Sequence, residues 1–160
     1  MIRAFRHLPM RRSAAIAAIA ATTACSSTSA PDAAATMTAD GLPPVLLTAD
    51  ADRWPHDAYE FTGMQRSGDT LTVAIRFGGG CRTHEFALLV SPAFMESYPV
   101  QMSGSLAHDA HGDTCRAIVH DTLRLDLSPL RRAYTAAYRT ESDTLVLHVA
   151  GWPLSVRYAF

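Results

Sequence analysis

Residues 70–77 read TLTVAIRF, and this stretch decides the fold class. Apolar side chains occupy every second position, namely Leu71, Val73, Ile75 and Phe77. This period of two is that of a β-strand with one buried face. Residues 59–65 suit a partner strand, and residues 66–69 (RSGD) suit a hairpin turn in which Gly68 supplies the permissive backbone. The stretch therefore predicts a β-hairpin.

The chain after this hairpin continues in the same manner. Short apolar or alternating stretches predict strands at residues 85–91, 100–108, 114–120, 123–127, 143–150 and 154–160. Helical character is confined to residues 128–138 (SPLRRAYTAAY), where Pro129 suits the first turn of a helix. Seven or eight strands at hairpin spacing predict an all-β domain over residues 43–160, an antiparallel β-sandwich or small barrel-like fold with one short helix.

The N-terminal residues have the three parts of a secretory signal peptide. Arginines are followed by the uncharged stretch 14–21 (AAIAAIAA) and then by small residues. The apolar stretch is shorter than the roughly 20 residues that span a bilayer. We therefore expect residues 1–24 to be removed after export, whether translation starts at Met1 or at Met10.

Residues 22–25 (TTAC) resemble the lipobox of bacterial lipoproteins, although Thr22 stands where that motif prefers leucine. The resemblance implies that Cys25 carries the lipid (palmitate among its acyl chains) and anchors the chain to a membrane. By the sorting rule of such lipoproteins, Ser26 favours the outer membrane, with the domain facing the periplasm. The alternative is a soluble periplasmic protein in which Cys25 is incidental. Residues 25–42, rich in Ser, Ala, Thr and Asp, are expected to form a flexible tether.

Charge excludes one class of partner. The chain has 14 arginines and no lysine, and four of the arginines but none of the 15 acidic residues precede Cys25. The part after the cleavage site therefore has a formal charge of 10 − 15 = −5. An acidic domain without a basic patch is not expected to bind nucleic acid. Membrane attachment would then depend on the lipid.

Two cysteines remain, Cys81 and Cys115. In an oxidising compartment they are expected to form a disulfide. The closed loop of about 34 residues would be worth roughly 3.5 kcal/mol in the chain-entropy model. The alternative is a zinc or copper site that uses His84, His108 and His111, with or without these cysteines, because imidazole and thiolate are ligands of both metals.

The pattern GGGC-x2-H-x-F at residues 78–86, with H-x6-C at 108–115 and DLSPL at 126–130, resembles a group of uncharacterised small bacterial lipoproteins. The resemblance covers about 50 residues and brings no activity with it. It implies that Cys81, His84, His108 and Cys115 belong to one local assembly.

No catalytic signature is present. The chain lacks Gly-x-Ser-x-Gly, a phosphate-binding loop, His-Glu-x-x-His and a dinucleotide fingerprint. We therefore expect a non-enzymatic envelope lipoprotein whose β-domain binds another envelope protein or has a structural role. No cofactor is expected outside the metal alternative.

Overall fold

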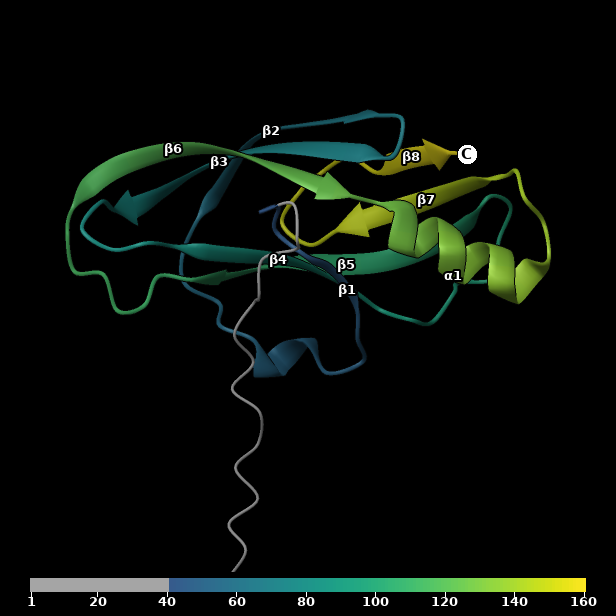
Figure 1. The fold of residues 1–160 in the computed structure, drawn as a ribbon, viewed down its shortest axis with the longest axis horizontal. Helices are drawn as coiled ribbons and strands as arrows, with labels where there is room; N and C mark the ends of the chain where they lie inside the picture. Colours follow the sequence, from purple (N-terminus) through teal and green to yellow (C-terminus); the bar gives the residue numbers. More distant parts are fainter. Residues whose placement is uncertain (1–40) are drawn as a thin grey trace, which may run out of the picture. The chain divides into compact units, whose positions relative to one another are not determined.

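The hairpin predicted from residues 59–77 is present in the computed structural model, which describes residues 41–160 (Figure 1). Strands β2 (Glu60–Ser67) and β3 (Thr70–Gly79) pair antiparallel, and Gly68 adopts the positive φ of 57° that the turn needs. The apolar positions of residues 70–77 are all buried, as the alternation predicts. A β-bulge between Phe61 and Gly63 shifts the register of β2.

Strand β6 (Ala117–Asp126) pairs antiparallel with β3 and completes a three-stranded sheet in the order β2-β3-β6. The sequence predicted two strands here, at 114–120 and 123–127. They form one strand because Val119, Leu123 and Leu125 lie in the same phase of the two-residue period. Asp121 shares that phase, so its charge interrupts the apolar pattern without ending the strand.

The second sheet has five strands in the order β1-β4-β5-β7-β8. These are β1 (Val45–Leu47), β4 (Glu85–Val90), β5 (Val100–Asp109), β7 (Thr144–Val149) and β8 (Val156–Ala159). The pairs β1–β4 and β5–β7 are parallel, unlike the antiparallel arrangement expected from the sequence. In both cases the chain visits the other sheet before it returns, and such a crossover allows parallel neighbours.

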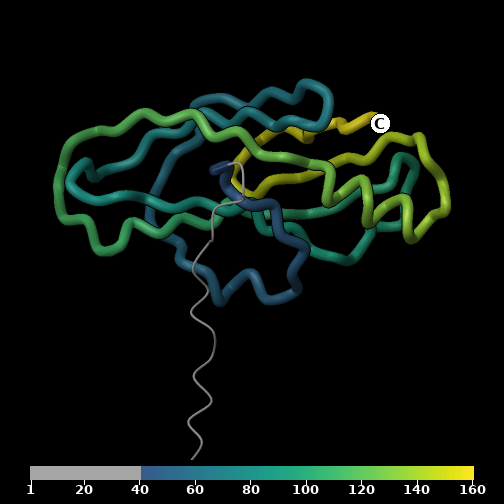
Figure 2. Tube along the Cα trace, in the orientation of Figure 1, coloured from purple at the N-terminus to yellow at the C-terminus, as the bar shows by residue number. Residues whose placement is uncertain are grey.

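Helix α1 (Ser128–Tyr138) has the bounds predicted from the sequence and buries Leu130 and Tyr134. A single 3₁₀ turn, η1 (Ala51–Arg53), precedes β2. Buried residues from both sheets and from α1 form the core. Figure 2 shows the backbone of the two sheets as separate layers. The predicted all-β fold of seven or eight strands with one short helix is confirmed, and the described residues form eight strands. Two separate sheets form a sandwich rather than the barrel-like alternative.

The predicted signal peptide, Cys25 and all but the last two residues of the predicted tether lie outside the described residues. Within residues 41–160, no helix combines the length and the apolar character needed to cross a membrane.

Candidate functional site

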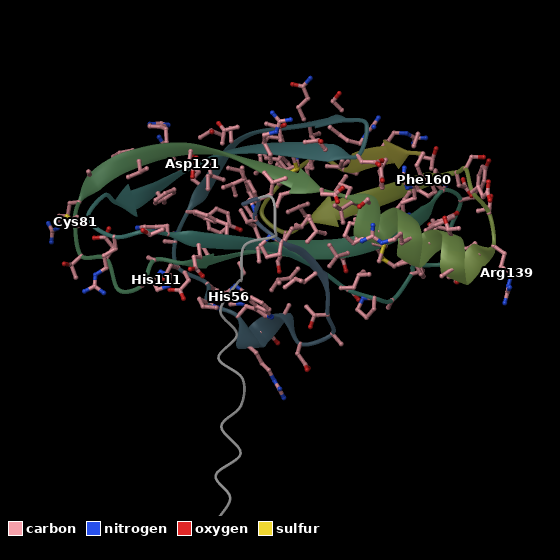
Figure 3. All side chains as sticks on the ribbon, in the orientation of Figure 1. His56, Cys81, His111, Asp121, Arg139 and Phe160 are labelled. Atoms are coloured by element: carbon pink, nitrogen blue, oxygen red, sulfur yellow. A yellow bond between two sulfur atoms is a disulfide. The ribbon has the colours of Figure 1, made fainter. Side chains whose placement is uncertain are left out.

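The Cys81–Cys115 disulfide lies at one end of the sandwich, labelled at Cys81 in Figure 3. Cys81 follows the end of β3 and Cys115 precedes the start of β6, and these strand ends are register partners at Gly79 and Ala117. The pairing therefore brings the cysteines together although 34 residues separate them. The sulfurs are 1.93 Å apart and the Cα atoms 6.0 Å apart.

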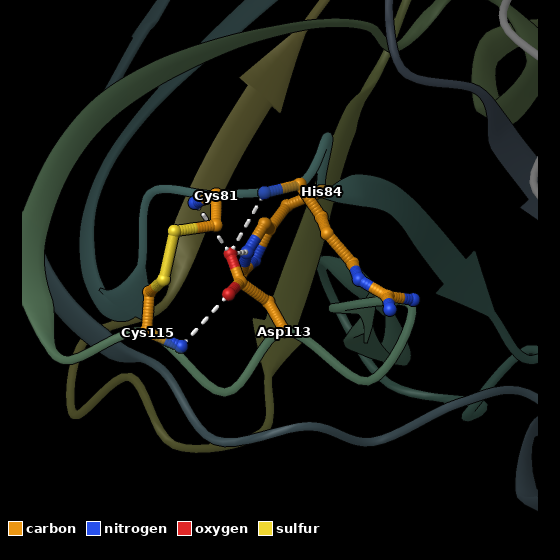
Figure 4. The surroundings of a disulfide bond; sticks show 5 residues. Cys81, His84, Asp113 and Cys115 are labelled. Atoms are coloured by element: carbon orange, nitrogen blue, oxygen red, sulfur yellow. Dashed lines mark hydrogen bonds and ion pairs between the residues drawn. A yellow bond between two sulfur atoms is a disulfide. The ribbon is translucent and has the colours of Figure 1, made fainter.

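The carboxylate of Asp113 lies beside the disulfide and binds the backbone around it (Figure 4). Oδ2 accepts the N–H groups of Cys81 at 2.9 Å and Arg82 at 3.0 Å, and Oδ1 accepts the N–H of Cys115 at 2.9 Å. These hydrogen bonds, that of Cys115 first, hold the pKa of Asp113 far below its ordinary value, and burial only partly opposes them. Asp113 is therefore a carboxylate that fixes both loops at this end.

Two histidines extend the cluster into the core. His84 Nε2 lies 3.3 Å from Asp113 Oδ2, and His84 Nδ1 lies 2.8 Å from His108 Nε2. His108 Nδ1 lies 3.1 Å from the backbone oxygen of Asp57. The result is a continuous chain of polar contacts from a carboxylate to a backbone carbonyl, with both imidazole rings in the middle.

The histidine pair is enclosed. His108 is 1% exposed, and the side chains of His84 and Asp113 are 4% and 1% exposed. Phe86 stacks on the His108 ring with centroids 4.4 Å apart, and Phe77 lies 4.5 Å from the His84 ring. A reacting group outside the protein therefore has no direct access to either imidazole.

His111 lies apart from this pair. Its Nδ1 lies 3.0 Å from the Thr83 carbonyl, and its Nε2 faces Asp109 at 3.8 Å and Glu85 at 4.0 Å. The structure does not gather His84, His108 and His111 around one point, since within residues 41–160 the one set of candidate ligand atoms within 4.8 Å of each other is Cys81, Asp113 and Cys115. Both sulfurs of that set are in the disulfide. A zinc or copper site stays a prediction that this geometry does not support.

The expectation that Cys81, His84, His108 and Cys115 form one local assembly matches their placement in the structure. Sequence reasoning missed the members that connect them, Asp113 and the backbone of Asp57. Asp113 stands two residues before Cys115, in the connection between β5 and β6. Its signal was the Asp-x-Cys spacing, which lets a carboxylate accept the cysteine's backbone N–H.

A second surface feature lies next to this end. Strand β6 pairs with β3 on one side, and its other edge has no neighbouring strand among the described residues. Ile118, the second residue of β6, is 67% exposed. It lines a hollow of about 390 Å³ together with Tyr59, Glu60 and Arg76. The hollow is therefore bordered by an exposed apolar side chain and an ion pair, because Arg76 and Glu60 contact each other at 2.6 Å.

No protein-family model and no curated protein sequence matches the chain. Several solved structures match the chain in fold. A NigD-like immunity protein from Bacteroides caccae superimposes with a TM-score of 0.51 at 17% identity, over 72% of this chain and 58% of that one. A candidate lipoprotein from Bacteroides fragilis gives a TM-score of 0.44 at 10% identity, over 73% and 67% of the two chains. The chain thus spans less than two thirds of the first of these proteins, and the likeness shows a shared fold alone.

Proposed function

We propose that the chain is an envelope lipoprotein whose β-domain is non-enzymatic and binds a strand of another envelope protein along the free edge of β6. The open edge beside exposed Ile118 is the observation that carries this proposal. An unpaired strand edge offers a row of backbone donors and acceptors, and peptide recognition by strand addition uses such a row.

The charges along β6 limit where a strand could dock. Residues 117–120 (AIVH) carry no formal charge, whereas residues 121–126 (DTLRLD) contain three charged side chains. Charged side chains are a usual way in which proteins protect an exposed edge. The partner strand is accordingly assigned to the first half of β6, around Ile118.

The polar cluster supports a binding rather than a catalytic role. His84, His108 and Asp113 bind one another and the backbone, and all three side chains are enclosed. General acid–base catalysis requires a group within hydrogen-bonding reach of the substrate. We therefore assign the cluster a structural role. It holds together the end of β3 and the start of β6, where Ile118 is exposed.

Site-specific photo-crosslinking in the exported protein tests this proposal. A photoreactive residue at His120 is expected to give one discrete adduct with an envelope protein, and adding Ile118→Asp is expected to remove it. The matched control places the photoreactive residue at Leu154, which is 66% exposed on the connection between β7 and β8. Equal adducts from both positions, or an adduct that survives Ile118→Asp, would contradict the proposal.

A further inference from the structure

We propose that His84 and His108 share one excess proton at neutral pH, held as an imidazolium–imidazole pair against Asp113, and that the pair acts as an acid-sensitive latch on the disulfide-bearing end of the domain. The number of hydrogens that the cluster needs sets this charge state, whether or not β6 binds a partner strand.

Three contacts of the pair each require one hydrogen from an imidazole nitrogen. The Asp57 carbonyl and the Asp113 carboxylate can only accept, so His108 Nδ1 and His84 Nε2 must both donate. Between His84 Nδ1 and His108 Nε2, at 2.8 Å, one nitrogen must donate and the other accept. Two neutral imidazoles carry two N–H groups in total. Three are needed, so the pair carries one more proton than its neutral form.

Either of the other charge states leaves a repulsive contact. In the neutral pair, a lone pair on one ring nitrogen must face another lone pair, a carbonyl oxygen or the carboxylate. In the doubly protonated pair, two N–H groups face each other across 2.8 Å. Both rings are enclosed, so water cannot relieve either contact without movement.

The groups around the pair determine which imidazole is neutral. Burial is the main cause that lowers the pKa of His108; its hydrogen bond to the Asp57 backbone opposes the shift, and the charge of His84 adds to it. Asp113 faces His84, so the excess proton is placed on His84, nearest the carboxylate. The rings that pack on the pair are uncharged aromatic side chains, Tyr59, Phe77 and Phe86.

Four other charged side chains near this end have partners outside the pair. The Asp57 carboxylate accepts the Ala110 N–H at 2.7 Å, and the Arg82 guanidinium donates to the His111 carbonyl. Glu85 and Asp109 face His111 on the outside of the cluster. None of these side chains makes a hydrogen bond to the facing nitrogens of the pair. A second added proton would therefore have no acceptor between the rings, and no carboxylate there would balance its charge.

Acidification should therefore open the two loops that carry Cys81 and Cys115, while strand β5, which carries His108, stays in place. His108 lies on β5 between aromatic rings, whereas His84 lies on the connection between β3 and β4 beside the atoms that Asp113 holds. When His108 takes a proton, His84 must move away, and the contacts of Asp113 with Cys81, Arg82 and Cys115 loosen. The disulfide keeps the two loops joined while they open.

The test is NMR of the exported protein with its disulfide intact. Long-range ¹H–¹⁵N spectra at pH 7 are expected to show three protonated nitrogens among the four of His84 and His108. Finding two would overturn the proposal without any variant being made.

The latch itself is tested by hydrogen exchange of the Cys81, Arg82 and Cys115 amides. After correction for intrinsic rates, their protection is expected to fall about sixfold from pH 7 to pH 5, because the closed pair keeps one proton while the two freed imidazoles, with ordinary pKa values of about 6.5, together gain more than one. His108→Gln, which can accept from His84 and donate to the Asp57 carbonyl without titrating, should largely abolish this change. The exposed His120→Gln is the matched control and should behave as the parent protein does. An equal loss of protection in His108→Gln would also overturn the latch.

Discussion

The carboxylate of Asp113 accepts the backbone N–H of Cys81 at 2.9 Å, although 32 residues separate them in the chain. The same carboxylate accepts the N–H of Cys115, the other half of the disulfide. Covalent and hydrogen-bonded links thus join the same two loops. Asp113 would fix the geometry of this end, and the disulfide would restrict how far the loops separate when that geometry is lost.

Replacing Asp113 with asparagine should destabilise the domain. The amide offers one oxygen, and its NH₂ group would face donors that the carboxylate accepts. Urea unfolding at pH 7 should show a lower midpoint than in the parent protein, while the exposed Asp121→Asn should leave it nearly unchanged.

The same variant should alter the response to acid. The pKa of Asp113 is lowered in the folded state, so its contribution to stability is present above the ordinary value of 3.8 and is lost as pH falls below it. Part of the acid destabilisation between pH 4 and pH 2 should therefore be missing in Asp113→Asn. An unfolding midpoint with the same pH dependence as the parent protein would show that Asp113 is not the group responsible.

Gly79 offers a test of how tightly the histidine pair is enclosed. A Cβ added there would lie 2.5 Å from His84 Nε2 and 3.0 Å from Asp113 Oδ2. Gly79→Ala should therefore displace His84 and cost about 1–3 kcal/mol of unfolding free energy. Gly79 also has a positive φ of 155°, which a residue with a Cβ disfavours, so the matched control is Gly112→Ala, where φ is likewise positive (64°) but nothing lies within 4 Å of an added Cβ. Equal stability of the two variants would mean that the ring can move freely.

Loss of the disulfide should be measurable separately from loss of Asp113. Cys81→Ser with Cys115→Ser removes a cross-link between residues 34 apart, which the chain-entropy model values at roughly 3–4 kcal/mol. Urea unfolding of the double variant and of the reduced parent protein should give similar midpoints. The double variant lacks the Cys81–Cys115 disulfide, so a reductant should not change its urea midpoint. An equal shift in both proteins would show that the reductant does not destabilise the parent protein by breaking this disulfide.

The elements that were predicted correctly are those determined by local pattern. Residues 128–138 form a helix with Pro129 in its first turn, and residues 70–77 form a half-buried strand, because each depends on side chains close in sequence. The parallel pairs β1–β4 and β5–β7 could not be predicted in this way. They depend on which sheet the chain crosses to, and hairpin spacing contains no information about that.

The site was predictable only in part for the same reason. Cysteine and histidine are conspicuous by type, so Cys81, His84, His108 and Cys115 could be selected from the sequence. The link between His84 and His108 depends on the β4–β5 register, in which Phe86 pairs with His108. Asp113 is one of many aspartates, and it becomes distinctive only when three backbone N–H groups converge on it.

A hydroxyl group buried at the other end of the sandwich gives a further prediction. Tyr158 is fully buried, and its OH donates to Asp69 Oδ1 at 2.8 Å, in the turn between β2 and β3. Tyr158→Phe should cost about 1–2 kcal/mol, since it removes a hydrogen bond to a carboxylate and retains the ring. Tyr98→Phe is the control because Tyr98 is 97% exposed. Thermal unfolding compares the two, and an equal effect would indicate that the Asp69 contact adds nothing.

The predicted lipid anchor can be tested at the two residues that would determine it. With Cys25→Ser, the exported chain should move from the membrane fraction to the soluble fraction, because the variant cannot carry the predicted lipid and an acidic domain without a basic patch is not attracted to anionic lipid. Ser26→Asp keeps the acylated cysteine and should shift the protein from the outer to the inner membrane. Mass spectrometry of the N-terminal peptide would show acyl groups in the parent protein and in Ser26→Asp but not in Cys25→Ser. A Cys25→Ser protein that still sediments with membranes would mean that some other part of the chain holds it there.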